Sequence, residues 1–548
     1  MDIWQRVTNR LGALPARRVT WGLVLTFSVW ALLDIFVFQL SHGITQSSFD
    51  AMVRARVVVA KPDPRIIIVD IDEASLARMG KEFGRWPWPR DTLATVLEHI
   101  ERQTPLAIAW DIVFSDADRL SPGGDAAFNE AAARSRHSHF PVVRLPQAND
   151  AASQLTREAL PGLWLATEPG AVAPSTGGKV ATVALIAPAL PAVAGSRLGY
   201  NNGYVDPDGV LRRYRYLDPL ADGHAIQSLP LSVLNAINPV AYRAYAIRPE
   251  AAMEPKNELI AWRHRADAYP RVPFADVFAQ AEGGKPLAPV PAFAGKVVII
   301  GATAPSLHDI HPTPLSAMQA GVDSMATVID NALNQRHIRE LPRWLQAALA
   351  IALCVGLALW VQFKSVASLA PALLALPAAL LAVSYLSLNG FSWFIDLHLA
   401  AGLALLFLAV LRFWSTLRRA YWCTPLLRPP QALAIWTWER SDAWLEAPLD
   451  RLIDALERHA PGCRIVIQDT SIIWPNTLRW PELACCMAVV GPHDALVAAR
   501  AQLEPALKRL ARRNSEIQLL DLPTNRKKLA NVVVSSWSRL QNRDNNPD

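Results

Sequence analysis

The chain has 548 residues and a mass of 60.2 kDa, which leaves room for two or three domains and excludes a peptide hormone or a small disulfide-stapled scaffold. Hydrophobic residues make up 51% and charged residues only 19%, so the chain is too apolar for a disordered protein and for most fully soluble enzymes. The net charge of +6 gathers at the two ends, beside apolar runs. This distribution indicates a mixed membrane and aqueous protein, and we expect no nucleic-acid partner.

The first apolar run covers residues 19–40, about the 20 residues that a bilayer-spanning helix needs. Four arginines precede it, so the positive-inside rule predicts that residues 1–18 are cytoplasmic: Arg6, Arg10, Arg17 and Arg18. A cleaved signal peptide is the alternative interpretation. The run is longer than the apolar region of about 7 to 15 residues in such peptides, and no small-x-small site follows it cleanly, so we expect an uncleaved anchor.

Three further apolar runs lie close together, at residues 344–363, 366–388 and 391–413. Tryptophans mark their ends, as in the aromatic belts of membrane helices: Trp344, Trp360, Trp393 and Trp414. Basic residues lie between the first two runs and after the third, which predicts that both places face the cytoplasm: Lys364, Arg412, Arg418 and Arg419. The chain is therefore expected to cross the membrane four times, with both termini inside and residues 41–343 outside.

The five cysteines fit this topology, since none of them falls within residues 41–343. An outer domain without cysteines needs no disulfide, and cytoplasmic thiols stay reduced. Cys485 and Cys486 are adjacent and have no CxxC spacing or neighbouring histidine set, so we interpret them as small core residues. We expect neither a metal site nor another cofactor.

The segment outside the membrane has the pattern of an α/β domain. Short β-branched runs at residues 65–71, 106–114 and 296–301 predict buried strands. Helical spacing follows at residues 72–80, 91–103 and 322–334. Strand, helix and strand in succession predict a partly parallel sheet.

Seven motifs of this segment occur in an order that closely resembles the type-two CHASE domain. They are VDIDEASL at 69–76, GRWPWPR at 84–90, AWDIVFSDAD at 109–118, VDPDGVLRR at 205–213, GKVVIIGATA at 295–304, HPTPL at 311–315 and GVDSMATVIDNAL at 321–333. The resemblance implies an extracytoplasmic sensory module of a bacterial transmembrane receptor, commonly followed by three membrane spans and a cytoplasmic output domain. It also implies that the receptor works as a homodimer.

Four acidic residues follow the predicted strands, where open α/β sheets place their ligands: Asp70, Asp72, Glu73 and Asp111. We take them as ligand-sensing candidates. The alternative, that they cap helices and accept hydrogen bonds in turns, is favoured by the preferences of aspartate.

His308, Asp309 and His311 offer two imidazoles and a carboxylate within four positions, a set that zinc could use. No third well-spaced ligand accompanies them, and the resemblance does not call for the histidines. We therefore expect a solvated loop here.

Asp34 lies within the first apolar run, where a carboxylate is costly and usually paired. Asp396 and His398 lie near the outer end of the fourth run, at a comparable depth. We treat these three as membrane relay candidates and predict a contact between Asp34 and His398. The equally weighted alternative is that Asp34 reaches the outer interface by itself.

Residues 425–525 predict a small cytoplasmic α/β domain of two strand-helix-strand units, followed by a loose tail at 526–548. Neither a phosphate loop, a kinase pair, a cyclase metal site, a hydrolase elbow nor an HExxH pair occurs in it. We expect no enzymatic activity here, although an unrecognised catalytic set is a third possibility. Trp474 and Trp480, on the loop WPNTLRWPE, are the partner-binding candidates.

The sequence thus predicts an α/β outer sensory domain, four transmembrane helices and a small inner α/β domain in a bacterial inner membrane. The expected function is a sensor or adaptor that relays an outside signal to a separate cytoplasmic output protein. A structural subunit of an envelope-spanning secretion or polysaccharide assembly is the alternative.

Overall fold

The fold is that of a computed structural model, which describes residues 10–118, 121–156, 159–166, 182–220, 224–246, 257–363, 371–423, 432–437, 446–467, 486–508 and 518–521, with 531 and 535. The chain divides into two compact units. One, here called the sensor unit, comprises residues 44–341 and 385–395; the other, here called the span unit, comprises residues 1–43, 342–384 and 396–548.

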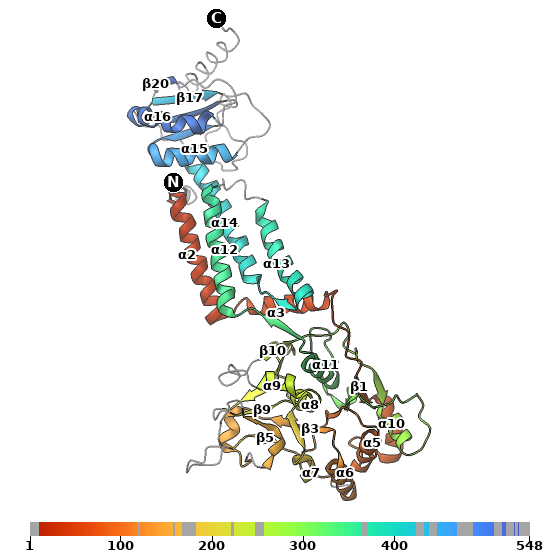
Figure 1. The fold of residues 1–548 in the computed structure, drawn as a ribbon. Helices are drawn as coiled ribbons and strands as arrows, with labels where there is room; N and C mark the ends of the chain where they lie inside the picture. Colours follow the sequence, from red (N-terminus) through yellow and green to blue (C-terminus); the bar gives the residue numbers. More distant parts are fainter. Residues whose placement is uncertain are drawn as a thin grey trace. The chain divides into compact units, whose positions relative to one another are not determined.

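A seven-stranded sheet forms the centre of the sensor unit (Figure 1). Its strands run in the order β11-β1-β12-β2-β3-β5, with β6 also paired to β3. All neighbouring pairs are parallel except β3 with β5. The strand bounds are β1 Ile66–Ile71, β2 Ala107–Trp110, β3 Ser138–Arg144, β5 Leu185–Ile186, β6 Arg197–Tyr200, β11 Arg271–Pro273 and β12 Val297–Ala302. The predicted mixed α/β fold with a partly parallel sheet is confirmed.

Helices cover both faces of this sheet. One face carries α4 Glu73–Phe83, α5 Arg90–Glu101, α6 Pro122–Arg134, α7 Pro191–Ala194 and α10 Phe274–Ala281. The other face carries α8 Leu229–Ile237 and α11 Gly321–Asn334, with α9 Pro239–Ala246 beside α8. Every residue of β1 is buried, because a strand covered on both faces has no solvated side.

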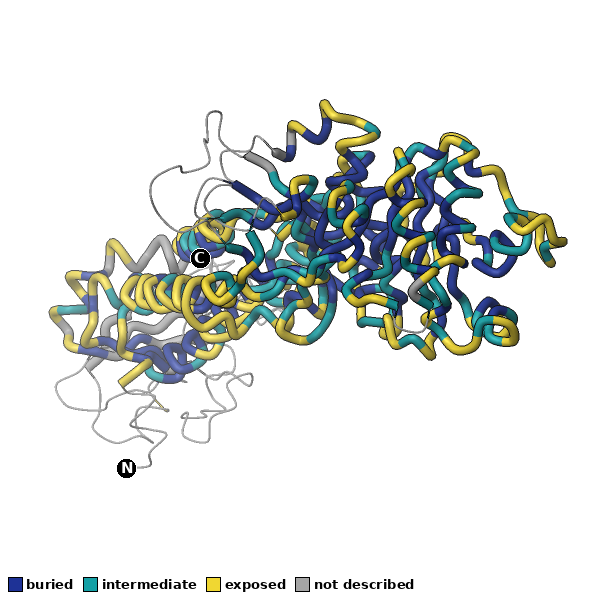
Figure 2. The backbone as a smooth tube through the Cα atoms, turned by 90° about the horizontal axis from the view of Figure 1, so that it is seen from below, coloured by how far each residue is buried: buried dark blue, intermediate teal, exposed yellow. Residues whose placement is uncertain are grey.

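Alternate strand residues therefore belong to two separate hydrophobic cores. Ile66 and Ile68 of β1 pack on the side of α8 and α11, whereas Ile67, Val69 and Ile71 pack against the opposite layer. Successive side chains of a strand point to opposite faces, which produces this division. Figure 2 shows the resulting band of buried chain through the sensor unit.

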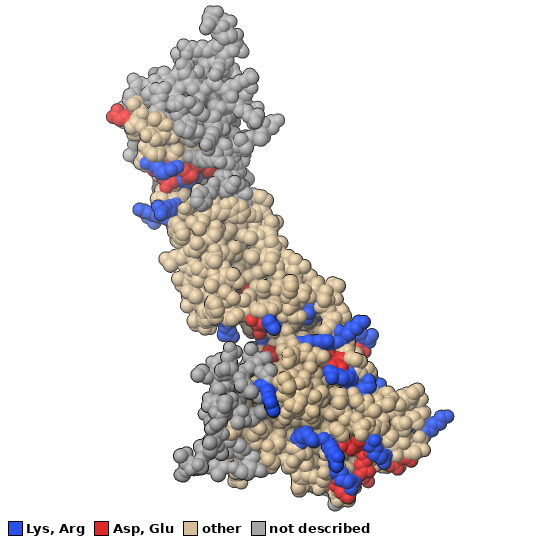
Figure 3. Space-filling view, in the orientation of Figure 1, with Lys and Arg blue, Asp and Glu red and all other residues tan. Residues whose placement is uncertain are grey.

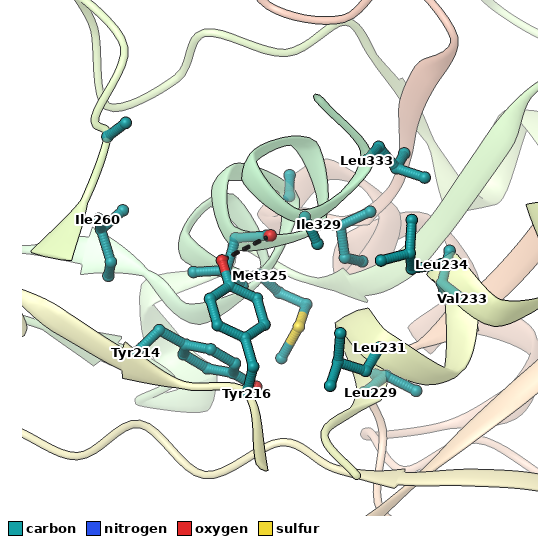
Figure 4. Close-up of a cluster of buried hydrophobic side chains, with 14 of the residues drawn as sticks. Tyr214, Tyr216, Leu229, Leu231, Val233, Leu234, Ile260, Met325, Ile329 and Leu333 are labelled. Atoms are coloured by element: carbon teal, nitrogen blue, oxygen red, sulfur yellow. Dashed lines mark hydrogen bonds between the residues drawn. The ribbon is translucent and has the colours of Figure 1, made fainter. Parts of the chain in front are cut away.

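A smaller layer closes the α8 and α11 side. It contains the sheet β16-β15-β10-β7, the sheet β4-β9-β8 and the pair β13-β14. The bounds are β4 Trp164–Ala166, β7 Arg213–Arg215, β8 Leu217–Pro219, β9 His224–Gln227, β10 Asn257–Ile260, β13 Ile310–His311, β14 Gln319–Ala320, β15 His337–Glu340 and β16 Trp393–Phe394. In the core that this layer covers, the Tyr216 hydroxyl donates to the Val328 carbonyl of α11 at 3.1 Å (Figure 4).

Four helices are long and apolar enough to cross a membrane: residues 16–38, 343–362, 372–391 and 398–422. They correspond to α2 Ala16–Leu33 with its π-helical end Asp34–Phe38, α12 Arg343–Phe363, α13 Ala372–Phe391 and α14 His398–Trp422. On the face drawn in Figure 3 their surface is almost free of charged atoms between the ends. A further helix, α3 His42–Arg54, follows the first span.

The last span begins later and ends later than its apolar run at 391–413 predicts. Ser392 takes a positive φ of 55°, and Trp393–Phe394 then pair with β15 as a short strand, so the backbone cannot be helical before His398. At the other end α14 continues through polar and basic residues to Trp422. Apolar composition located the span, and tertiary pairing set its start.

The α/β pattern predicted for residues 425–525 corresponds to one antiparallel sheet of order β18-β19-β17-β20. Its elements are β17 Ala432–Thr437, α15 Glu446–His459, β18 Arg464–Ile467, β19 Cys486–Gly491, α16 His493–Lys508 and β20 Gln518–Asp521. Each strand-helix-strand unit therefore has a strand of the other unit inserted between its two strands. This is the split βαβ arrangement of ferredoxin-like folds, whose members have many unrelated functions.

Candidate functional site

The carboxyl ends of the parallel strands bring three of the four predicted sensing residues to one edge of the sheet. Asp70 lies in β1, Asp72 follows it, and Asp111 follows β2. Glu73 begins α4 directly after Asp72. The structure assigns these residues to three different environments.

Asp70 belongs to a neutralised cluster. Its carboxylate accepts the Thr303 hydroxyl at 2.7 Å and lies 3.3 Å from the Arg271 guanidinium. Arg271 also pairs with Asp323 of α11 at 2.8 Å. Burial raises the pKa of Asp70, and burial with the nearby Asp70 charge raises the pKa of Asp323 to about 6, against the opposing effect of Arg271. One arginine thus serves two carboxylates.

Asp72 and Glu73 have structural roles. The Asp72 side chain accepts the Ser75 N–H at 2.7 Å, which makes it the N-cap of α4. Glu73 is exposed and accepts the Ser306 N–H at 3.0 Å, which lowers its pKa. For these two residues the geometry fits the capping alternative better than ligand binding.

Asp111 lines a pocket of about 510 Å³, within the range of small-molecule sites. The described residues that line it are Trp86, Asp111, Ile112, Val113, Asn201, Gly203, Val205, Leu211, Tyr214, Ala302, Leu307, Asp309, His311, Gly321, Ser324, Met325 and Val328. The pocket lies beyond the ends of β2 and β12, where parallel sheets place their ligands. It is our candidate ligand site.

A backbone hydrogen bond holds Asp111 at the carboxyl end of β2. Its N–H donates to the Ile300 carbonyl of β12 at 2.8 Å, and Asn201 donates to its carboxylate at 3.4 Å. Gly301 permits this approach, because a β-carbon there would lie 3.1 Å from Asp111 Cβ and 2.8 Å from a methyl carbon of Val322. Burial, and then the charge of Asp309, raises the pKa of Asp111 to about 7.

Two members of the predicted solvated loop line this pocket. Asp309 is exposed and irregular, as predicted, whereas for His311, which is half-buried in a strand, the prediction was wrong. Asp309 lines its rim, and His311 lies in β13, where its Nε2 is 2.9 Å from the Ser324 hydroxyl of α11. Pairing of β13 with β14 holds the segment in place. His308 is exposed as expected. In the described part of the chain, no three His, Cys, Asp or Glu side chains gather closely enough to hold a metal ion.

Sequence reasoning missed Asn201, Tyr214 and Ser324 as pocket residues. Tyr214 comes from β7 and Ser324 from α11, so no local spacing connects either residue with Asp111. The signal available was that Ser324 falls within a motif of the family resemblance and Tyr214 directly follows another. Their meeting point required the fold.

The membrane relay candidates each have local partners. Asp34 is buried in the π-helical end of the first span, where its carboxylate accepts the Leu40 N–H at 2.9 Å and the Ser41 hydroxyl. The imidazole of His398 is 3.0 Å from the Asp396 carboxylate. The structure contains no hydrogen bond between Asp34 and His398, and their contact stays a prediction.

The partner-binding candidates Trp474 and Trp480 lie outside the described residues. Their role stays a prediction.

Comparison with known proteins gives one match. The family model described as the CHASE2 domain covers residues 23–360. No curated protein and no solved structure matches the chain. The matched range contains the first span, the whole seven-stranded sheet and the pocket beyond its edge, and most of α12. The chain therefore belongs to the CHASE2 family, a family of sensory domains.

Proposed function

We propose that this protein is a non-enzymatic sensor and adaptor of a bacterial cytoplasmic membrane. In this proposal the sensor unit lies outside, where its pocket detects a cue. Four helices carry the signal across the bilayer, and the inner α/β domain passes it to a separate cytoplasmic output protein. The positive charges before the first span and after the last one support this orientation, with both termini inside.

The observation that carries the relay is the junction of α14 with the inner domain. The last turn of α14 places Arg419 against Asp450 of α15, with two hydrogen bonds of 2.8 Å in a buried environment. Arg418 pairs with Asp454 at 2.8 Å and with Glu457. Trp422 packs into the core of the inner domain. One continuous helix therefore joins a membrane span to the inner domain, so that movement of the span would move α15.

The sensor unit has its own attachment to a span. Its residues 385–395 include the end of α13, where the Tyr385 hydroxyl donates to the Ala55 carbonyl at 2.8 Å. The Asn389 side chain accepts the N–H groups of Val57 and Val58 at 3.0 and 2.9 Å. These contacts tie the end of α13 to the segment that leads into β1. In this proposal, a rearrangement at the edge of the sheet would shift the end of α13, the third span.

Cross-linked pull-down from native membranes tests this proposal. We compare the full chain, a chain that stops after Trp422, and the variant Arg419→Glu, with the double variant Arg419→Glu/Asp450→Arg as the rescue. We expect the full chain and the double variant to capture a cytoplasmic protein, and the other two forms to lose it. Rescue by the reversed pair would attribute the loss to the junction.

The competing function is a structural subunit of an envelope-spanning secretion or polysaccharide assembly. If only envelope proteins come down, equally with the full and the shortened chain, that function replaces the sensor. Turnover of a nucleotide or phosphodiester by the purified full chain would contradict the non-enzymatic part. We also propose a homodimer, since a relay through four helices is simplest between two copies.

A further inference from the structure

The pocket beyond β2 and β12 differs from the rest of the sensor unit in its charge pairing. Among the described residues, every buried aspartate of this unit forms an ion pair with an arginine: Asp50, Asp63, Asp70, Asp218, Asp276, Asp323 and Asp330. Neither Asp111 nor Asp309 has such a partner, and no lysine or arginine is among the described lining residues. Asp111 is half-buried and Asp309 is exposed at the rim, where the His311 imidazole is the nearest group that can carry a positive charge. Two carboxylates thus line one pocket without a lysine or arginine.

A buried hydroxyl lies on the same wall. Tyr214 is only 3% exposed, and its hydroxyl makes no well-formed hydrogen bond to a described residue, although the Ser228 hydroxyl lies close by. Burial and then the Asp111 charge raise the pKa of Tyr214, and Ser228 opposes this effect. A buried hydroxyl without a full hydrogen bond costs free energy unless a ligand or water completes it. The Tyr214 hydroxyl is therefore available to a polar group of a ligand.

The remaining wall is apolar and aromatic. Trp86, Leu211, Met325 and Val328 line it, and Figure 4 shows Met325 in the same core region as the rings of Tyr214 and Tyr216. Aromatic faces and methionine suit a compact organic body, and an aromatic face also attracts a cation. A ligand here would meet negative charge at one end and apolar surface at the other.

We infer that the pocket binds a small organic amine in its protonated form, with the ammonium group between Asp111 and Asp309 and an apolar body against Trp86 and Met325. This inference rests on the proposed sensor function and names the chemical class of the cue. The ammonium group supplies the counter-cation that arginine supplies to the other aspartates. Asn201 and Ser324 provide further hydrogen-bonding groups on the wall.

A divalent metal ion fits the pocket less well. Calcium takes six to eight oxygen ligands, more than the four oxygens of the two carboxylates, and magnesium demands near-ideal octahedral geometry. The apolar wall would also have no contact with a bare ion. Calcium chloride is therefore the competitor in the test.

Binding is measured by calorimetry on the full chain in detergent micelles. The ligand probes are tyramine, benzylamine and choline. Their matched analogues are 4-ethylphenol, which lacks the amine of tyramine, benzyl alcohol, 3,3-dimethylbutanol and the anion 3-(4-hydroxyphenyl)propionate. We expect at least one cation to bind about tenfold or more tightly than its neutral analogue, since a desolvated charge pair is worth that much. The anion should not bind.

Two variants and a control locate the site. Asp111→Asn and Asp309→Asn should each weaken the best cation about tenfold, because each removes one charge from the pair. Asp267→Asn removes a 53% exposed carboxylate elsewhere in the unit and should leave binding unchanged. Two independent pocket variants keep the test decisive if one of them fails to fold.

The inference is overturned if no cation exceeds its neutral analogue, if calcium alone binds, or if both pocket variants bind like the parent chain. Because calorimetry uses the purified chain, these outcomes do not touch the relay. Amine binding without capture of a cytoplasmic partner would instead refute the proposed function and leave the pocket's ligand class standing.

Discussion

Two pairs of carboxylates lie near the carboxyl ends of the strands in the sensor unit, and only one of the two pairs has an arginine partner. Asp70 and Asp323 share Arg271, and Thr303 completes the shell of Asp70. Asp111 has only an amide at 3.4 Å, while Asp309 repels it. The first pair is satisfied within the fold, and the second leaves charge open toward a cavity.

The difference teaches how to separate structural from functional acids in an open α/β sheet. Position at the carboxyl end of a strand does not distinguish them, since Asp70 of the first pair and Asp111 of the second both have it. The presence of an internal cation does. A satisfied pair stabilises the fold, whereas an unsatisfied pair costs stability that a ligand can restore.

Of the variants proposed here, the removal of Arg271, which Asp70 and Asp323 share, should change the stability most. Arg271→Met leaves Asp70 and Asp323 buried and uncompensated, and should lower the free energy of unfolding by about 3 kcal/mol. Arg271 is 30% exposed, which keeps the loss at the lower end for such pairs. Thermal unfolding of the full chain in micelles measures it, with Arg265→Met as the exposed control that should change little. Equal effects of the two variants would refute the special role of Arg271.

Crowding the pocket edge should come next. In Gly301→Ala the new β-carbon would lie 2.8 Å from a methyl carbon of Val322 and 3.1 Å from Asp111 Cβ, so overpacking should cost about 2 kcal/mol. Gly80→Ala is the matched control, because its β-carbon meets nothing within 4 Å and an alanine favours helix α4. Thermal unfolding should show a lowered midpoint for the first and an unchanged or raised midpoint for the second. A neutral Gly301→Ala would mean that Asp111 has room to move.

Neutralising Asp111 should stabilise the protein. The pKa of Asp111 is raised to about 7 in the fold, so the folded state holds an extra proton between pH 4 and 7 and its stability falls as the pH rises through that window. Asp111→Asn should flatten this fall and gain about 1 kcal/mol at pH 8, after allowance for the partial exposure of the carboxyl. The other titratable groups on the pocket wall are Asp309, His311 and Tyr214. Unfolding midpoints from pH 4 to 8 for both forms measure the effect, and parallel curves would contradict it.

The affinity for an amine should also depend on the protonation of Asp111, but it should rise with pH where the stability falls. As the pH rises from 6 to 8, Asp111 loses its proton and becomes the partner that the ammonium needs, so binding should tighten. Calorimetry of the best amine at pH 6 and pH 8 measures this change. Asp111→Asn should remove most of it, and a pH dependence that survives this variant would point to His311 instead.

The smallest effect should come from the helix cap. Asp72→Ala removes the acceptor for the Ser75 N–H and should cost about 1 kcal/mol, while Asp72→Ser should restore most of it. Amine affinity should stay the same in both variants. Asp72→Ser keeps the cap, so a loss of amine affinity in this variant would show that Asp72 takes part in ligand binding.

Much of the architecture could be predicted from sequence because its signals are local. Buried strands such as Ile66–Ile71 are continuous β-branched runs, and the apolar length of a span is visible in any window. Asp111 was identified as a sensing candidate from its place after a strand. The remaining strand-end acids needed their partners, which only the fold supplies.

What sequence could not supply was long-range pairing. His311 looks like part of a solvated turn until β13 pairs with β14 beside a pocket that Trp86, Asp111 and Tyr214 also line. The late start of α14 has a similar cause, since the pairing of Trp393 with Arg339 overrides an apolar stretch that reads as helix. In both places tertiary contacts outweigh local pattern.

The length of α14 has a consequence of its own. Its 25 residues extend about 37 Å, more than the roughly 30 Å of a hydrocarbon core, so a helix of this length that spans a bilayer is still helical where it emerges. Each inserted residue turns such a rod by about 100° and lengthens it by only about 1.5 Å. A rotary signal would therefore return with a period of about 3.6 insertions, whereas a piston signal would change steadily. Insertions of one to four residues in α14 would therefore distinguish whether the proposed relay depends on rotation or on translation of this helix.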